Sequence, residues 1–222
     1  MSFFGKTTTV SFGAISVYYW PMPQRGSYPK GVAKREELVS VALEVVAERG
    51  YNGATLREVS EAAGLSKTGV LHHFANKEEL FTEVLSRRDE LNLHALDADS
   101  SPAGATLADT LATGLQRNAM VPGLVQLYSR LSADATDPEN PAHSYFEERY
   151  VHGRNFIEDV VRQEKEQGLL APSIDPRMFG VILLALSDGL QMQWMFNPEL
   201  DMAAHMQHLF DTLAPPRETT NE

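Results

Sequence analysis

Hydrophobic residues recur with helical spacing along most of the chain, and the clearest case is the stretch 55–74. Its apolar positions are Leu56, Val59 and Ala63 in a first segment and Val70 and Phe74 in a second. Thr55 and Ser66 stand where N-caps are expected, and Gly64 supplies the backbone freedom that a tight turn needs. The pattern therefore predicts two short helices, joined by a turn, whose apolar faces pack together.

The segments on either side of this pair are also predicted to be helical. One helix is expected over residues 32–50, ending at Gly50, and another begins at the capping-box pair Asn76 and Glu79 and extends to about residue 95. Their apolar positions are Leu38, Val39, Ala42, Leu43 and Val46 in the former and Leu80, Phe81, Val84 and Leu85 in the latter.

After a break at residues 97–104, the pattern predicts five more helices. Their expected spans are 107–118, 122–131, 142–167, 178–196 and a final helix over 202–213. Asp175 and Pro176 suit the cap and the first turn of the fourth of these. The expected fold class is all-α. We expect an N-terminal helix-turn-helix domain at 31–96 and a helical ligand-binding and dimerisation domain at 97–214. An arm at 1–30 and a tail at 215–222 are expected to flank them.

The stretch 181–186 is apolar on every side, so its helix has to be covered on more than one side. Asp188 and Gln193 interrupt the apolar run, which disfavours a membrane span. We expect this helix and the final one to pack against a second subunit and form a homodimer. The residues predicted for that interface are Val181, Leu184, Leu186, Asp188, Trp194, Met202, Met206 and Phe210.

Charge is distributed unevenly, with a net charge of +3 over residues 1–30, −3 over 31–94 and −11 over 95–222. Between Glu61 and Glu78 there is no acidic residue, although the chain as a whole is acidic. A local acid-free surface rich in donors suits phosphates and base edges, and it indicates contact with double-stranded DNA through a small patch. The residues predicted to contact DNA are Thr55, Ser66, Lys67, Thr68, Gly69, Leu71, His72, His73 and Lys77.

Residues 34–85 resemble the N-terminal domain of the TetR family of bacterial transcriptional regulators. The resemblance rests on Thr55, the turn Ala62-Ala63-Gly64, the pair Ser66-Lys67, Phe74 and the run Lys77-Glu78-Glu79-Leu80. It implies a dimer whose last two long helices pair, and an effector pocket in the larger domain. Leu71 and His72 stand where the family often has aromatic residues, so contacts made by a tyrosine ring there do not carry over.

The side chains available to an effector pocket are mostly apolar, which favours a small, partly hydrophobic effector. The candidates are Leu111, Leu115, Met120, Leu124, Tyr128, Arg149, Tyr150, Asn155, Phe179, Gln191 and Met192. Two functions follow. The first is a dimeric repressor that an effector releases from its operator. The second is a helical protein-interaction module whose helix-turn-helix does not bind DNA.

Several other functions are not expected. The chain has no cysteine, which excludes disulfides and thiolate sites and fits a cytoplasmic protein. It has no G-x-S-x-G, phosphate-binding glycine loop or H-E-x-x-H, so neither an enzyme nor a cofactor is expected. His205 and His208 have helical spacing that suits either a metal ion or an ordinary interface histidine.

Residues 1–30 differ from the rest, with frequent Ser, Thr, Gly and Pro and no acidic residue. They do not have the pattern of a signal peptide. We expect either a mobile arm or a basic arm in which Arg25 and Lys30 reach DNA phosphates.

Overall fold

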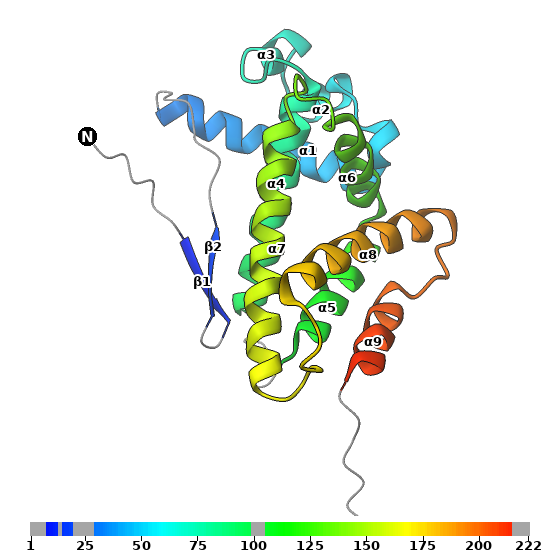
Figure 1. The fold of residues 1–222 in the computed structure, drawn as a ribbon. Helices are drawn as coiled ribbons and strands as arrows, with labels where there is room; N and C mark the ends of the chain where they lie inside the picture. Colours follow the sequence, from blue (N-terminus) through cyan, green and yellow to red (C-terminus); the bar gives the residue numbers. More distant parts are fainter. Residues whose placement is uncertain (1–7, 13–14, 20–28, 99–104, 215–222) are drawn as a thin grey trace, which may run out of the picture. The chain divides into compact units, whose positions relative to one another are not determined.

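The computed structural model describes residues 8–12, 15–19, 29–98 and 105–214 (Figure 1). The helices in these ranges are α1 (Pro29–Gly53), α2 (Leu56–Ala62), α3 (Lys67–Leu71), α4 (Lys77–Ala98), α5 (Leu107–Ala119), α6 (Pro122–Asp134), α7 (His143–Glu166), α8 (Pro176–Phe196) and α9 (Met202–Leu213). Each corresponds to a helix that the sequence pattern predicts, so the helical fold is confirmed.

One element was not predicted. Strands β1 (Thr8–Phe12) and β2 (Ile15–Tyr19) pair antiparallel, with Val10 opposite Val17. Both strands are rich in the β-branched and aromatic residues that favour strands, which is the signal that the sequence carried. Of the basic residues predicted for a DNA-binding arm, Arg25 lies outside the described residues and Lys30 lies in the first turn of α1.

The helix boundaries follow from local capping. The Asp175 side chain accepts a hydrogen bond from the Met178 N–H at 2.8 Å and caps α8, with Pro176 in the first turn. Asp201 caps α9 in the same way, through the Ala204 N–H at 2.9 Å. Gly50 has a φ of 68° and interrupts α1 where the sequence predicts its end.

By contacts, the chain divides into two units. Unit 1 comprises residues 1–101 and 118–147, and unit 2 comprises residues 102–117 and 148–222. Unit 1 therefore includes α6, which the sequence assigns to the C-terminal domain. The functional boundary between residues 96 and 97 stays a prediction.

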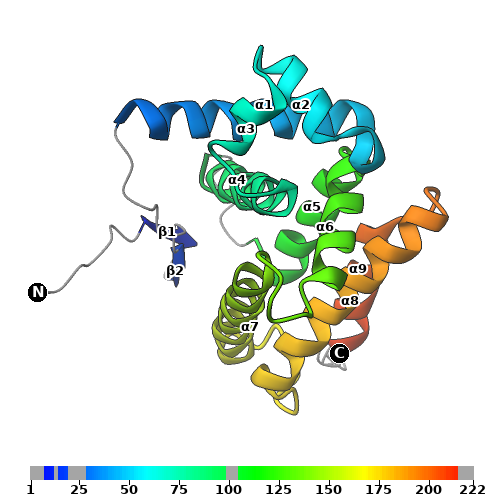
Figure 2. The ribbon, with the colours of Figure 1, turned by 90° about the horizontal axis from the view of Figure 1, so that it is seen from above.

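Unit 1 is built around α1, which packs against α2, α4 and α6 (Figure 2). The helices α1 and α6 approach closely at Gly123, where an added Cβ would lie 2.2 Å from the Val46 carbonyl oxygen and 3.0 Å from the Gly50 Cα. Glycine is required there because the two backbones are nearly in contact.

Unit 2 consists of α5, most of α7, α8 and α9. Phe179 on α8 meets Phe210 on α9, with ring centroids 5.8 Å apart. The carboxylate of Glu164 on α7 accepts the Leu107 N–H at 2.6 Å and so caps α5 from a distance. Burial raises the pKa of Glu164, against the lowering effect of that hydrogen bond.

Among the described residues, α8 alone is long and apolar enough to cross a membrane by length and composition. That criterion is weak for one helix, because core helices of soluble proteins also meet it. Asp188 in this helix accepts a hydrogen bond from the Tyr150 hydroxyl at 2.6 Å, which ties the middle of α8 to α7.

The α1–α6 crossing can be tested with Gly123→Ala. The added methyl group would overlap the Val46 carbonyl, so we expect a loss of about 1–3 kcal/mol in the free energy of unfolding, measured by urea denaturation. Gly114→Ala in α5 is the matched control. No atom lies within 4 Å of its Cβ position, so a gain of about 0.5–1 kcal/mol is expected from helix propensity. Equal effects of the two changes would contradict a close backbone approach at Gly123.

Candidate nucleic-acid interface

The helices α2 and α3 form a helix-turn-helix, as predicted. The Thr55 hydroxyl accepts the Glu58 N–H at 3.4 Å, and the Ser66 hydroxyl accepts the Gly69 N–H at 3.1 Å, so both helices carry the expected N-caps. Gly64 has a φ of 65° in the turn between them, a conformation that favours glycine.

The α3 helix buries one face and exposes the other. Val70 and the nearby Phe74 are buried in unit 1. The exposed residues at and before this helix are Ser66, Lys67, Thr68, Leu71 and His72; Thr55 and Lys77 are exposed beside it, and Gly69 is half-buried. We call the exposed residues 66–68, 71 and 72 the α3 surface. The structure thus brings the predicted DNA-binding residues together, and their contacts with DNA stay a prediction.

The two adjacent histidines differ in environment. His72 is exposed, whereas His73 is half-buried. Burial, followed by the charges of His72, Arg35 and Lys34, lowers the pKa of His73. The lowered pKa favours the neutral form of His73. His72 is the more exposed of the two, and the DNA contacts of both histidines stay a prediction.

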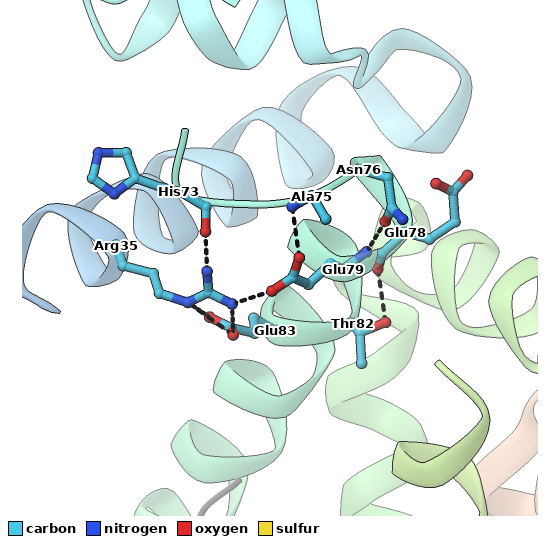
Figure 3. Close-up of polar contacts among 8 residues, drawn as sticks. All are labelled: Arg35, His73, Ala75, Asn76, Glu78, Glu79, Thr82 and Glu83. Atoms are coloured by element: carbon cyan, nitrogen blue, oxygen red, sulfur yellow. Dashed lines mark hydrogen bonds and ion pairs between the residues drawn. The ribbon is translucent and has the colours of Figure 1, made fainter. Parts of the chain in front are cut away.

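Arg35 on α1 holds the residues that follow α3 (Figure 3). Its guanidinium donates to the His73 carbonyl oxygen and to the Glu83 carboxylate, and it donates to Glu79 Oε1 at 2.8 Å. The same group lies over the Phe74 ring, 4.1 Å from the centroid. One side chain therefore joins α1, the residues after α3 and the first turns of α4. We call this set of contacts the Arg35 clamp.

The start of α4 is fixed by a related set of bonds (Figure 3). Asn76 Oδ1 accepts the Glu79 N–H at 2.8 Å, as the capping box predicts. The reciprocal bond differs from the prediction, because Glu79 Oε2 accepts the N–H of Ala75 at 2.6 Å. Glu79 thereby serves both the helix start and the Arg35 clamp.

The predicted effector residues are divided between the two units, and their role stays a prediction. Met120, Leu124 and Tyr128 lie in unit 1, and the others lie in unit 2. Leu115, Leu124, Tyr128, Phe179 and Gln191 are buried, and Leu111, Arg149 and Tyr150 are half-buried. Met120 is 81% exposed, and Asn155 and Met192 are also exposed, which argues against a place for these three in an enclosed pocket.

A groove of about 410 Å³ lies in unit 2 on α5 and α9. The residues along it are mostly small or polar, namely Ala112, Gln116, Asp201, Ala203, Ala204, Gln207, His208 and Asp211. It contains none of the predicted effector residues. His208 lies on its wall, but the described residues include no cluster of three or more groups that could hold a metal ion.

The predicted dimer residues fall into two classes. On α8, Val181 is exposed, and Leu184, Leu186 and Asp188 are half-buried. In contrast, Trp194, Met202, Met206 and Phe210 are buried within unit 2. These four belong to the core of the single chain, which corrects their assignment to an interface. The apolar stripe of α9 packs on its own chain, and its exposed positions are mainly polar.

Two arginines were not singled out by the sequence. Arg35 makes its contacts with residues 38 to 48 positions away, and a charged residue on a helix gives no local sign of such partners. Arg88 on α4 lies in a run of charged residues but is buried in unit 1. The one sign of burial in the sequence was its position. Arg88 follows the buried Phe81 by seven residues, which places both residues on the same face of the helix.

Comparison with known proteins places these observations in context. Residues 38–84 match the family described as "Bacterial regulatory proteins, tetR family". The chain is 29% identical over 153 residues to the HTH-type transcriptional repressor KstR2 of Mycobacterium tuberculosis, covering 64% of this chain and 72% of that one. It is 45% identical over 60 residues to the repressor AcnR of Corynebacterium efficiens, covering 27% and 31% of the two chains.

Among solved structures, the fold is similar to that of the transcriptional regulator FadR from Bacillus subtilis in complex with stearoyl-CoA. The TM-score is 0.62 at 17% sequence identity, and the match covers 81% of this chain and 97% of that one. At this identity the likeness supports the fold alone.

The Arg35 clamp can be tested with Arg35→Met, which retains apolar contact area for Phe74 but removes the charge and the hydrogen bonds. We expect a loss of about 1–2 kcal/mol in unfolding free energy, since the clamp is partly exposed to solvent. Duplex affinity should fall without a change in its salt dependence, because Arg35 is engaged within the protein. Arg162→Ala is the control, since within the described part of the chain Arg162 pairs only with Glu158 and Asp159 on the surface of α7. A salt slope that changes in Arg35→Met would assign this residue to DNA instead.

Proposed function

The chain belongs to the TetR family of bacterial regulatory proteins, and on that basis we propose that it is a dimeric repressor released from operator DNA by a small effector. The observation that carries the proposal is the α3 surface. It is exposed, has no acidic residue and is held on a helix whose other face is buried. A recognition helix in the major groove needs these properties.

Roles for residues on and beside the α3 surface follow from the chemistry of each side chain. Lys67 and Lys77 are exposed cations suited to phosphates. Thr68, Gly69 and His72 suit base edges, because a small residue permits close approach and His72 offers ring nitrogens. The acidic remainder of the chain disfavours non-specific DNA binding.

The alternative function, a helical interaction module, has less support. An interaction surface for a protein does not require the acid-free window from residue 62 to residue 77. The relatives named above are repressors. The family consists of transcriptional regulators, and we propose that this chain acts in the cytoplasm, without catalytic activity.

The proposed dimer contact is the outer face of α8. Its exposed apolar residues are Met178, Val181, Ile182, Met192 and Phe196, which share one side of the helix by spacing. Since Phe179, Leu183 and Trp194 on the inner face are buried in unit 2, α8 is apolar on two sides and a second copy of the chain would cover the outer one.

Release from DNA requires that an effector change the position of the recognition helices. In the proposed mechanism α4 transmits this change, because it begins beside the α3 surface at Lys77 and carries both glutamates of the Arg35 clamp. A ligand that binds the arrangement unable to bind DNA about a hundredfold more tightly than the DNA-binding arrangement shifts the equilibrium between the two by roughly 2.7 kcal/mol. The same linkage requires operator DNA to weaken effector binding equally.

DNA recognition is tested by selecting sites from a random duplex pool and titrating variants on the selected site. Lys67→Ala should weaken binding to all duplexes and lower the salt slope by about one unit for each phosphate that the lysine neutralises. His72→Ala should relax the preference at one operator position by about 1–3 kcal/mol. A folded Lys67→Ala protein with the affinity and slope of the wild type would refute the assignment, and Arg162→Ala provides the unchanged reference.

The dimer is tested by sedimentation of Ile182→Glu. Burying this carboxylate against a second apolar helix would be costly, so the variant should be monomeric at micromolar concentration, where the wild type is dimeric. The control is Leu169→Glu, which alters another exposed apolar residue outside α8. Its dimer should persist. Loss of the dimer in both variants, or in neither, would exclude α8 as the specific contact. If the contact holds, the operator is an inverted repeat with half-sites about 34–36 Å apart or slightly more.

A further inference from the structure

Arg88 on α4 is a buried cation whose hydrogen-bonding capacity is largely unused. The residue is 8% exposed, and its Nε and Nη1 have no hydrogen-bond partner among the described residues. Its Nη2 lies 3.5 Å from Asp89 Oδ1, which is longer than a charge-assisted hydrogen bond of about 2.7–2.9 Å. Buried arginines are normally paired through several of their five donors, so this one calls for an explanation.

Arg88 lies beside a group of aromatic residues that comes from α6 and the start of α7, within unit 1. Its Cζ lies 5.8 Å from the centroid of the Tyr128 ring on α6. Phe146 at the start of α7 packs on Tyr128 and on Tyr145, with centroids 5.4 Å and 5.0 Å apart. The Tyr145 hydroxyl donates to Asp89 Oδ2 at 2.7 Å, so that carboxylate is shared. We call these residues, 88, 89, 128, 145 and 146, the Arg88 cluster.

We propose that the Arg88 cluster binds the anionic group, a carboxylate or phosphate, of a small effector with an apolar body. This inference rests on the proposed function and specifies the chemical class of the effector. An anion would supply the acceptors that Nε and Nη1 lack and would balance the guanidinium charge more fully than Asp89 does. A neutral ligand supplies no charge, and a cationic ligand would be repelled.

The apolar residues beside Tyr128 suit the apolar part of such a ligand. Leu124 precedes Tyr128 by four residues and Leu131 follows it by three, so the three lie on one face of α6. All three are buried in unit 1. Aromatic and aliphatic surface around one cation is the composition expected of a site for an amphipathic anion.

The position of Arg88 on α4 connects the site to the α3 surface. Arg88 follows Lys77 by eleven residues on the same helix, a rise of about 16 Å at 1.5 Å per residue. Glu79 and Glu83, which hold the Arg35 clamp, lie between them. An anion that binds Arg88 would therefore contact the same helix, α4, whose glutamates hold the Arg35 clamp beside the α3 surface.

The first experiment uses the full chain without DNA or ligand and compares Arg88→Met with Arg87→Met. The neighbouring Arg87 is exposed and pairs with Glu90 at 2.9 Å, so it is a matched control on the same helix. If Arg88 serves a ligand, replacing its buried, only partly balanced charge with an apolar side chain of similar length should give a Tm at or above that of the wild type. A Tm well below that of Arg87→Met would mean that Arg88 is structural, for example through bound water, and would overturn the proposal.

The second experiment measures binding by calorimetry with matched probes, octanoate and octyl phosphate against octanamide, and 4-phenylbutyrate against 4-phenylbutyramide. At least one anion should bind the wild type and Arg87→Met equally, its neutral match should bind weakly, and Arg88→Met should lose affinity by about 10- to 100-fold. Failure of every anion to bind, or equal binding of anions and amides, would overturn the proposal. Because no DNA is present, these outcomes are independent of whether the chain binds an operator.

Discussion

A helix of five residues has almost no stability of its own, and the candidate recognition helix α3 is of that length. Its orientation depends on what surrounds it. Val70 and Phe74 anchor it from below, and the Arg35 clamp holds the residues that follow it against α1 and α4. The proposed DNA contacts of Lys67 and His72 therefore depend on an arginine more than thirty residues earlier, which holds the backbone that leads into α4.

The elements with local signals were predictable from the sequence. Caps such as Asp175 and Asn76 act on backbone groups three residues away, so sequence spacing specifies them. The same reasoning located the exposed residues of α3, because the buried Val70 on the helix and Phe74 just after it determine which side remains for solvent. The hairpin of β1 and β2 was missed because the prediction gave more weight to turn-forming residues than to the β-branched ones between them.

The interactions that link distant segments were not predictable in the same way. A hydrophobic stripe such as Met202, Met206 and Phe210 predicts that one face of a helix is buried. The pattern does not indicate whether α8 of the same chain or a second subunit covers that face. In the structure the same chain covers it. Arg35 and Arg88 show the corresponding limit for charges, since the partners of a long polar side chain depend on tertiary packing and not on spacing.

The close approach at Gly123 makes the contact of α1 with α6 more rigid than its contact with α4. The backbone of α6 lies almost against that of α1, so a shift of one helix along the other would cause a steric clash and we expect the pair to move together. The packing of α1 on α4 includes the Arg35 side chain, and a side chain changes rotamer more easily than packed backbones separate. We therefore expect movement within unit 1 to occur at the contact between α1 and α4. Substitutions that stabilise this contact would be the first choice for holding the protein in one state.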